Sequence, residues 1–552
     1  MPKFLFSDKE LVNSLQKIPD GSVIAISGFN ISIAPEYLML KLYEAFEKTG
    51  HPNHIFIESD SLPGSPGRGI DYISKEVYDS GRTDFLAGVL VPFLGWAPWL
   101  QKLINEEMIE GYTCSIGSMA HWFREIAAGR PGLLTKVGLG TFLDSEHDAG
   151  ALNGKAREKK RVGIETVNLK GENYLFVTAP KPNVSLVRGT TSDEIGNISM
   201  EKEGIYGTVF SITQAARAVP NPGIVFCQVE RIARLGTINP KAVHIPGPLI
   251  DYVAVAPPEF SWQTDSIVFD PRISGGIIPP QFHRKNSISG ITAKNIILRR
   301  SSLEITKEIQ RAGRPLIANF GVGIPSEIPG VLDNENISDY IYSTVEAGPW
   351  GGIPLTGDDF GVSIGPFAII PLPDQFTLYE GGMIDVTSLG FMQIDREGNV
   401  NPSMLPGRMP GPGGFPTITN GSPSIIFAGQ FTAGKSDIKI ENGTVKIVED
   451  GEPVKFVQSL YKVLFRSDIA LRNGKRVIYV TERAVFELTS KGLTLKEIAP
   501  GIDIDRDVID KMAFKPHIQG EVSIMDRRIF VQRKLGLHPM IKGIKKGTLS
   551  ES

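Results

Sequence analysis

The residue whose type and setting most clearly allow chemistry is Glu346. It follows a run of β-branched and aromatic residues in the segment 340–361, YIYSTVEAGPWGGIPLTGDDFG, and five glycines come after it within that segment. Ligands of open parallel sheets bind beyond the carboxyl ends of the strands, and backbone without side chains lets a bulky substrate approach closely. A carboxylate in this position can act as a nucleophile or as a general base. The alternative is an acid at a surface turn that faces water.

Several other glutamates also stand two positions before a glycine, so this spacing does not single out Glu346. Glu441 lies in the segment 438–447, IKIENGTVKI, which alternates apolar and polar residues around Asn-Gly, the strongest short signal of a β-hairpin. We therefore expect Glu441 to point into water at a hairpin tip. Glu380 and Glu449 share the spacing as well, and Glu346 is set apart from them by its place between an apolar strand and a long glycine- and proline-rich stretch.

Two glycine-rich turns offer backbone N–H groups to such a site. In the segment 318–328, ANFGVGIPSEI, Gly321 and Gly323 follow a strand, and Pro325 opens a helix whose first N–H groups would favour a phosphate. In the segment 406–415, PGRMPGPGGF, the glycines could expose N–H groups to a developing oxyanion. Either segment could instead be an ordinary packing turn or a surface loop.

Composition narrows the class of protein. The chain has 552 residues and a formal net charge of −3, which argues against nucleic acid or an anionic membrane as a partner, because both need a basic face. Two cysteines, Cys114 and Cys227, cannot form a disulfide framework, so we expect a reducing cytoplasm. The apolar stretch 85–100 is shorter than the roughly 20 residues of a membrane span and is broken by Pro92 and Pro98. The eight histidines show no metal-ligand spacing, so no metal is expected.

Short apolar runs bounded by turn residues alternate with amphipathic segments along the chain. Examples of the apolar runs are SVIAIS at 22–27 and PLIANFG at 315–321. This pattern predicts an α/β fold with mostly parallel, open sheets covered on both faces. A chain of this length needs more than one hydrophobic core. The stretch 271–292 is rich in Pro, Gly and Ser, so we expect the boundary there, with domains at 1–285 and 286–552.

The two expected domains share sequence features. An Asp, two residues and then Gly-Asn occur at 193–197 and again at 395–399. The intervals from Asn197 to Gln228 and from Asn399 to Gln430 are both 31 positions long, and each includes an apolar strand near its end. Turns of this type are common, but two diverged copies of one α/β unit fit the paired spacing better.

Taken in order, these landmarks resemble those of the family I coenzyme A transferases, most closely the single-chain acetate/3-oxoacid type in which both halves are fused. The C-terminal half carries NFGVGIP, STVEAGPWGGIP, YEGGMIDVTSLGFMQIDREGNVN and GPGGF. The N-terminal half carries AAGRPGLLTKVGLGTF, VRGTTSDEIGNISMEKE and QVERIARLGTINP. The resemblance spans nearly the whole chain. It implies two related open α/β domains with the active site at their junction.

The resemblance also implies an activity, which is the transfer of CoA from an acyl-CoA to a small carboxylic acid. Glu346 would be the nucleophile, carrying first an acyl-glutamyl anhydride and then a glutamyl-CoA thioester. The CoA thioester is a substrate, and no permanently bound cofactor is implied. A homo-oligomer, dimer or tetramer, and a place in short-chain fatty acid or ketone body metabolism are further implications. Gly413 and Gly414 match the turn beside the thioester, and the CoA-binding turn is matched by Gly321, Val322, Gly323, Ile324 and Pro325.

The chain departs from the family pattern near residue 116. Relatives are expected to carry a glutamine there that helps to hold the carbonyl oxygen, whereas this chain has Ile116. Either Ser115 or Ser118 compensates, or that oxyanion donor is absent. The preceding stretch is also more apolar than expected, which suggests an acyl pocket for a chain bulkier or more branched than acetate. The alternative is that these residues are simply core: Phe93, Leu94, Trp96 and Trp99.

Three other functions compete with a transferase. An acyl-CoA hydrolase on the same scaffold would let water intercept the anhydride, and the two activities differ in how well the site excludes water. A sugar-phosphate isomerase is possible because a fold does not determine function, but it needs an acid/base pair that does not accompany Glu346. The third is a catalytically inactive CoA-binding or assembly protein, which the departure at Ile116 would allow.

Overall fold

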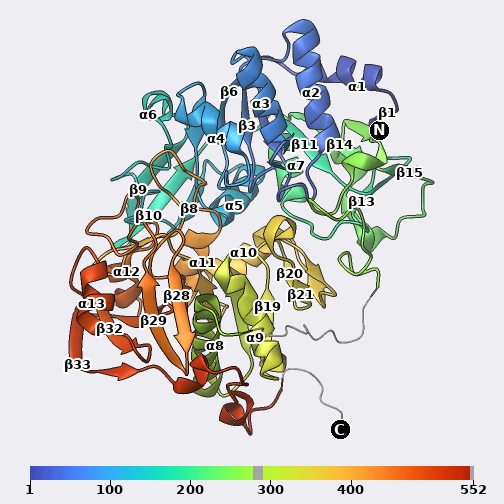
Figure 1. The fold of residues 1–552 in the computed structure, drawn as a ribbon. Coiled ribbons are helices and arrows are strands. Elements are labelled where there is room, and N and C mark those ends of the chain that lie inside the picture. The colour runs from blue at the N-terminus through green and yellow to red at the C-terminus, as the bar shows by residue number, and fades with distance from the viewer. Residues whose placement is uncertain (278–289, 547–552) are drawn as a thin grey trace.

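Two large sheets form the frame of the molecule, one in each half of the chain (Figure 1). The computed structural model describes residues 1–277 and 290–546. In the first sheet, each pair of neighbouring strands is parallel. Its strands, in spatial order, are β1 (Lys3–Leu5), β17 (Tyr252–Val255), β14 (Ile224–Val229), β11 (Val184–Arg188), β2 (Val23–Ile26), β3 (Ile55–Glu58), β6 (Leu86–Leu90) and β7 (Glu110–Tyr112).

The second sheet has a parallel centre with antiparallel pairings toward both sides. The α/β class predicted from the sequence is therefore confirmed. The strands of this second sheet, in spatial order, are β23 (Ala368–Ile369), β20 (Pro349–Trp350), β19 (Ile341–Thr344), β18 (Leu316–Phe320), β24 (Val386–Leu389), β27 (Ser424–Ala428), β30 (Arg476–Val480), β31 (Ala484–Thr489), β32 (Gly492–Ile498) and β33 (His517–Ile524).

Five strands follow the same spatial order in both sheets. The order is β17-β14-β11-β2-β3 in the first and β30-β27-β24-β18-β19 in the second. In each unit the first strand along the chain lies between the second and the third. The chain therefore passes from the first strand to one neighbour and later returns to the strand on its other side, which makes β2/β11 and β18/β24 the switch points of the two sheets. Open parallel sheets bind ligands at such switch points.

Central strands are buried at every residue, as β11 and β27 show. Strands that are buried on both faces need helices on both faces, which the alternating pattern of the sequence predicts. The helices are α1 (Asp8–Leu15), α2 (Glu36–Thr49), α3 (Ile70–Ser80), α4 (Pro98–Asn105), α5 (Ile116–Ala127), α6 (Gly154–Lys159), α7 (Val209–Arg217), α8 (Ala293–Ala312), α9 (Ile328–Asn334), α10 (Leu372–Glu380), α11 (Phe415–Gly421), α12 (Ser467–Arg472) and α13 (Ile504–Asp507).

The paired Asp-x-x-Gly-Asn segments have nearly identical hydrogen bonds. Asp193 accepts from the backbone N–H and from the side-chain amide of Asn197, both at 2.9 Å. Asp395 accepts from the same two groups of Asn399 at 2.8 and 2.9 Å. Such agreement, added to the common strand order, is what two copies of one unit would leave behind.

The two halves are joined by backbone hydrogen bonds at the starts of four helices. The Ile116 N–H, at the start of α5, donates to the carbonyl of Gly413, just before α11, at 3.0 Å. The Leu372 N–H, at the start of α10, donates to the carbonyl of Gly207, just before α7, at 3.1 Å. Figure 1 shows α5, α10 and α11 between the blue-green and the yellow-red halves. Each half therefore donates one such hydrogen bond to the other, and each bond joins the start of a helix in one half to the start of a helix in the other half.

The expected domain boundary at 285/286 lies outside the described residues. On its N-terminal side, residues 263–272 already contact the second half, since the Thr264 hydroxyl donates to Asp359 at 2.7 Å and the Gly365 N–H donates to the Arg272 carbonyl at 2.9 Å. The first half thus extends onto the second before the chain crosses over.

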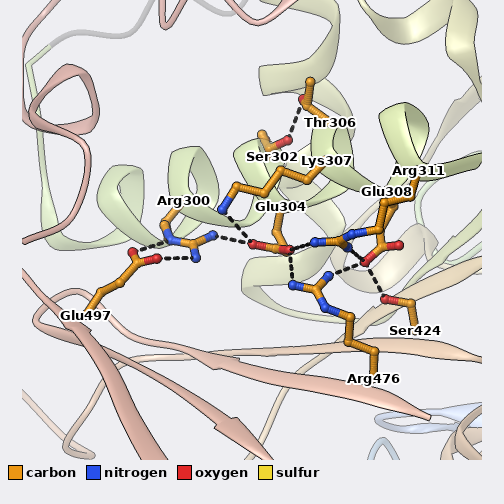
Figure 2. Close-up of polar contacts among 10 residues, drawn as sticks. All are labelled: Arg300, Ser302, Glu304, Thr306, Lys307, Glu308, Arg311, Ser424, Arg476 and Glu497. Carbon is orange, nitrogen blue, oxygen red and sulfur yellow. Dashed lines mark hydrogen bonds and ion pairs between the residues drawn. The ribbon is translucent and has the colours of Figure 1, made fainter. Parts of the chain in front are cut away.

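A buried cluster of charges holds α8 against the second sheet (Figure 2). Glu304, in the middle of α8, contacts Arg300 one turn earlier at 3.0 Å and Arg476 of β30 at 2.5 Å. Arg300 in turn forms two bonds of 2.9 Å with Glu497 of β32. Burial by itself would raise the pKa of Glu304, but the positive charges of Arg300, Lys307 and Arg476 outweigh it and lower that pKa to about 2. The cluster therefore links one helix to two strands through ionised groups.

Replacing Glu304 by glutamine should destabilise the fold strongly. The change removes the buried carboxylate that Arg300 and Arg476 share; Arg300 keeps Glu497 and Arg476 keeps Glu308, but the cluster is left with an excess of positive charge, and breaking a buried pair costs about 3–5 kcal/mol. Urea unfolding at neutral pH measures this loss. The matched control is Glu44→Gln, whose partners Lys41 and Lys48 lie at the surface of α2, and we expect it to cost less than about 1 kcal/mol. Equal losses for the two variants would contradict the assignment.

Candidate functional site

A pocket of about 180 Å³ lies at the junction of the two halves. Nineteen residues line it, and thirteen of them come from the second half, including the loops that follow β18 and β24. The pocket therefore opens at the switch point of the second sheet, where the strand order predicts a ligand. The residues from the first half are Phe29, Asn30, Ser61, Phe93, Trp96 and Ile116.

Glu346 lies in a tight turn between β19 and β20 and lines this pocket. The turn is closed by hydrogen bonds from the Val345 N–H to Pro349 at 2.9 Å and from the Gly348 N–H to Val345 at 3.0 Å. Gly348 has a φ of +120°, and a Cβ there would lie 1.9 Å from the carbonyl oxygen of Ile370. Gly348, two residues after Glu346, is thus required for the chain to reverse direction. This reversal holds the Glu346 side chain at the pocket wall instead of at the surface.

Burial is what sets the ionisation of Glu346. The residue is 9% exposed, and desolvation raises its pKa from 4.5 to about 7. Within residues 1–277 and 290–546, no Lys, Arg or His forms an ion pair with it. Glu346 is also the sole ionisable side chain among the nineteen that line the pocket. A carboxylate here has no competing counter-ion and titrates near neutral pH.

A buried hydrogen-bond network supports the end of β19 beneath Glu346. The Tyr379 hydroxyl donates to the Thr344 hydroxyl at 2.9 Å, and the Asn319 amide donates to the Tyr379 hydroxyl at 3.1 Å. Burial first, and to a lesser degree the charge of Glu346, raise the pKa of Tyr379. Tyr379 therefore stays protonated, and the network positions the strand end without taking part in proton transfer.

Gly414 touches the Glu346 carboxyl. A Cβ on Gly414 would lie 2.6 Å from Glu346 Oε2, so any side chain there would displace the acid. The neighbouring Gly413, with a φ of +57°, donates its N–H to the Pro92 carbonyl at 2.9 Å. Of the two glycines matched to the thioester turn, Gly413 therefore uses its amide to hold the turn, whereas Gly414 forms no backbone hydrogen bond through its N–H within the described part of the chain.

The expected CoA-binding turn meets the pocket with its first two residues. Gly321 and Val322 line it, and a Cβ on Gly321 would come within 2.8 Å of Leu389. The helix predicted to open at Pro325 begins as a short 3₁₀ turn, Ile324–Glu327, before α9. Gly323 is exposed, Ile324 is half-buried and Pro325 is buried, and these three lie along the same loop outside the pocket lining.

Ile116 lines the pocket but brings no side-chain donor, and neither expected substitute replaces one. The Ser115 hydroxyl pairs with Thr417 at 2.6 Å, and Ser118 does not line the pocket. A residue that sequence reasoning missed does provide an amide, since Asn30 lines the pocket and is 3% exposed. Its side-chain amide donates to the Phe360 carbonyl at 3.5 Å, the outer limit of a hydrogen bond. The signal for Asn30 was its place just after a buried strand, as Gly321 and Gly323 follow theirs.

The competing glutamates lie elsewhere. Glu441 ends β28 (Asp437–Glu441), which pairs with β29 (Thr444–Glu449) across an exposed Asn-Gly turn, so the predicted hairpin is confirmed. Glu449 is exposed at the end of β29. Glu380 ends α10 and accepts a hydrogen bond from the Thr135 hydroxyl at 2.5 Å. None of the three lines the pocket that contains Glu346.

Comparison with known proteins places this geometry in one family. The model of the coenzyme A transferase family matches residues 10–256. The caffeate CoA-transferase of Acetobacterium woodii is 36% identical over 97% of this chain and 99% of that protein, and the acetate CoA-transferase YdiF of Escherichia coli K12 is 33% identical over 96% of both. The chain belongs to the coenzyme A transferase family. The crystal structure of the acyl-CoA transferase YdiF from Escherichia coli O157:H7, a thioester complex with CoA, matches with a TM-score of 0.84 over 97% of both chains at 31% identity.

As a member of this family, the chain is a CoA-transferase and takes a CoA thioester as its substrate. The family resemblance inferred from the motifs is confirmed. Within the described residues, no group of three or more His, Cys, Asp and Glu is arranged to hold a metal ion. None of the described helices combines the length and hydropathy that crossing a membrane requires.

The apolar stretch that precedes residue 100 in this CoA-transferase divides into two sets. Phe93 and Trp96 are half-buried and line the pocket. Leu94 is fully buried core, and Trp99 packs outside the pocket against Tyr78, with ring centroids 5.6 Å apart and planes tilted by 50°. Leu94 and Trp99 thus agree with the core interpretation, whereas Phe93 and Trp96 line the pocket that contains Glu346, and an acyl pocket for a bulky chain stays a prediction.

Proposed function

We propose that this CoA-transferase works through Glu346, which carries first the acyl group and then CoA. The single observation that carries the proposal is the placement of the Glu346 carboxyl, buried in the junction pocket and against Gly414. A carboxylate is a weak nucleophile, so positioning and an oxyanion site matter more to it than basicity. Both are available here, because the turn holds the acid and glycine keeps the approach to it open.

The proposed chemistry needs no proton transfer. A Glu346 carboxylate oxygen attacks the carbonyl carbon of the acyl-CoA, the carbon–sulfur bond breaks, and its electron pair leaves on the CoA thiolate. The thiolate then attacks the Glu346 carbonyl carbon of the anhydride, forms the glutamyl-CoA thioester and releases the first acid as a carboxylate. A second carboxylate runs these steps in reverse and leaves as a new acyl-CoA. Charge is conserved at each step, so an apolar pocket with one ionisable group suits the reaction.

Two donors are placed to stabilise the oxyanions of these steps. The Gly414 N–H is one, since it lies beside the Glu346 carboxyl and is not engaged by the described backbone. The Asn30 side-chain amide is the other, since it is buried in the pocket wall with a weak partner. A buried amide without a good partner costs free energy, which a substrate oxygen would offset. Asn30 thus replaces the amide that is absent at Ile116.

Replacing Asn30 by alanine should lower kcat about 10²-fold, the usual effect of losing one oxyanion donor, with little change in KM for the acyl-CoA. Steady-state kinetics with saturating acceptor acid measure it. Asn30 has a φ of +57°, so the matched control is Asn336→Ala, at an exposed position with a φ of +59° outside the pocket. The control should keep its kcat. An unchanged kcat in Asn30→Ala would remove this residue from the reaction.

The test of the proposed function is to trap the intermediate. The protein is incubated with an acyl-CoA and no acceptor, treated with borohydride or hydroxylamine, and digested, and the altered peptide is identified by mass. We expect the modification at Glu346. Modification at another residue would overturn the assignment, and the absence of any modification would favour the inactive CoA-binding protein.

An acyl-CoA hydrolase is the nearest alternative, and the 9% exposure of Glu346 favours transfer because it limits access of water to the intermediates. CoA release measured with and without an added carboxylic acid separates the two activities. An isomerase is disfavoured because Glu346 has no ionisable partner in the pocket. The relatives are named for different acids, caffeate and acetate, so family membership leaves the acid open.

We also propose that the chain has two domains, 1–285 and 286–552, joined within 271–292. The repeated five-strand order supports this division, because each half contains one complete unit. Self-association and a cytoplasmic location remain predictions from the sequence. Light scattering on the purified protein tests the first.

A further inference from the structure

We propose that the acyl part of the pocket is built for a neutral acyl group that carries an aromatic ring. This inference rests on the proposed function, since it names the substrate class of the same site. The ring would lie among aromatic side chains, with the carbonyl carbon at Glu346. Acetyl and dicarboxylic acyl groups would be poor substrates by comparison.

Aromatic side chains dominate the wall. Phe93 and Trp96 form an edge-to-face pair with centroids 5.5 Å apart and planes at 90°. Phe29 and Phe360 form a second pair, 6.3 Å apart and tilted by 33°. All four line the pocket together with Phe415. Aromatic rings attract a further ring through edge-to-face and offset contacts at these distances, so two such pairs favour an aryl group over an aliphatic one of equal reach.

The rings of the aromatic wall pack directly against glycines, where a larger residue would displace them. A Cβ on Gly95 would lie 2.4 Å from the ring of Phe93. A Cβ on Gly361, whose φ is +123°, would lie 2.7 Å from the ring of Phe29. Leu94, next to Phe93, donates its N–H to the Pro410 carbonyl at 2.7 Å, which ties this segment to the turn beside Glu346. The rings are therefore held before substrate binds.

The size of the pocket agrees with one ring. Its volume is about 180 Å³, and an apolar cavity of about 150 Å³ holds a benzene molecule. An acetyl group has a single methyl to place in this space and would leave most of the aromatic wall without contacts. A ring on a short spacer would fill it.

The charges of the pocket exclude a second carboxylate. No Lys, Arg or His is among the nineteen lining residues, and Glu346 is the single ionisable one. A dicarboxylic acyl group would bring an unpaired negative charge into an apolar wall, next to a group that is itself an acid, and burial of an unpaired charge is strongly unfavourable.

The test compares four thioesters at a fixed concentration of one acceptor acid, using the full-length protein: 3-phenylpropanoyl-CoA, hexanoyl-CoA, acetyl-CoA and succinyl-CoA. We expect kcat/KM for 3-phenylpropanoyl-CoA to exceed that for acetyl-CoA at least about 100-fold, because each buried methylene is worth about tenfold or more. It should exceed that for hexanoyl-CoA roughly 3- to 10-fold through ring contacts. Succinyl-CoA should be the poorest. An equal or higher kcat/KM for acetyl-CoA overturns the proposal.

A variant pair shows whether the aromatic wall is the cause. Trp96→Leu should lower kcat/KM for 3-phenylpropanoyl-CoA about tenfold more than it lowers kcat/KM for acetyl-CoA. Trp99→Leu, three residues later and outside the pocket, should preserve the ratio between the two substrates. A parallel fall for both substrates in Trp96→Leu would mean a structural role only and would overturn the inference.

Trapping at Glu346 separates failure of this inference from failure of the proposed function. If acetyl-CoA labels Glu346 as fast as 3-phenylpropanoyl-CoA does, the aromatic substrate class falls and the transferase mechanism stands. If none of the four thioesters labels Glu346, the mechanism falls and this inference falls with it.

Discussion

Replacing Glu346 by glutamine is expected to reduce CoA transfer at least about 10⁴-fold, because the amide cannot form the anhydride and loss of a covalent nucleophile removes the whole reaction path. Steady-state transfer between an acyl-CoA and a carboxylate measures the loss. Glu441→Gln is the matched control, since Glu441 also stands two residues before a glycine but lies at an exposed hairpin. It should retain full activity. Transfer by Glu346→Gln within tenfold of the parent would rule out covalent catalysis at this position.

The same substitution should stabilise the protein above neutral pH. Burial raises the pKa of Glu346 from 4.5 to about 7, so the folded state holds this proton more tightly than the unfolded state. Below pH 4.5 both states are protonated and the group contributes nothing. As pH rises from 4.5 to 7 the unfolded state ionises first, which costs the folded state up to about 3 kcal/mol above pH 7. Glu346→Gln removes that cost, so its free energy of unfolding should exceed that of the parent at pH 8 and equal it at pH 4.

The activity of the parent protein should follow the same ionisation. The carboxylate is the nucleophile, so kcat/KM for the acyl-CoA should rise as pH increases through about 7 and then level off. Rates between pH 5 and 9 test this prediction. A profile that is already flat at pH 5 would mean that Glu346 ionises like an exposed acid.

Replacing Gly414 by alanine is expected to reduce kcat about 10²-fold or more. The new Cβ would lie 2.6 Å from Glu346 Oε2 and 3.1 Å from the ring of Phe376, so the carboxyl must move, and a displacement of about 1 Å at a reacting group costs about 10²-fold. Gly414 has a φ of −81°, which alanine adopts without strain. The expected defect is therefore in the position of Glu346 and not in the backbone.

A double-mutant cycle isolates that contact. Gly414→Ala should lose stability in the parent but regain part of it when Glu346 is also replaced by alanine, because the shortened side chain no longer meets the new methyl group. Urea unfolding of the four proteins measures the coupling. Gly276→Ala, at a glycine without a positive φ where the nearest contact of a Cβ would be at 3.4 Å, reports the cost of the substitution type. Additive effects of the two substitutions would place Gly414 away from the acid.

Local chemistry made several features of this chain predictable. The Asn-Gly pair between alternating strands defines the hairpin of β28 and β29, because that turn is set by two adjacent residues. The repeated Asp-x-x-Gly-Asn turn was visible for the same reason, since its hydrogen bonds join residues four positions apart. The setting of Glu346, at a strand end before Gly348, is local too.

Features that depend on contacts between distant residues were beyond the sequence. The sequence could not show that the Gly413 N–H donates to the Pro92 carbonyl, or that Asn30 from the first half lines the same pocket as Glu346 from the second. It also left open which aromatic residues of 93–99 line the pocket, because that depends on how the two halves pack against each other.

By itself, the sequence determined the α/β class, the family and the candidate nucleophile, because strand patterns, glycine turns and one acid beside them are encoded in short segments. The tertiary structure alone decided the burial that brings the pKa of Glu346 near 7, the contact with Gly414 and the aromatic wall. The physical reason is that desolvation and packing arise only when segments some 300 residues apart, such as Ile116 and Gly413, come into contact.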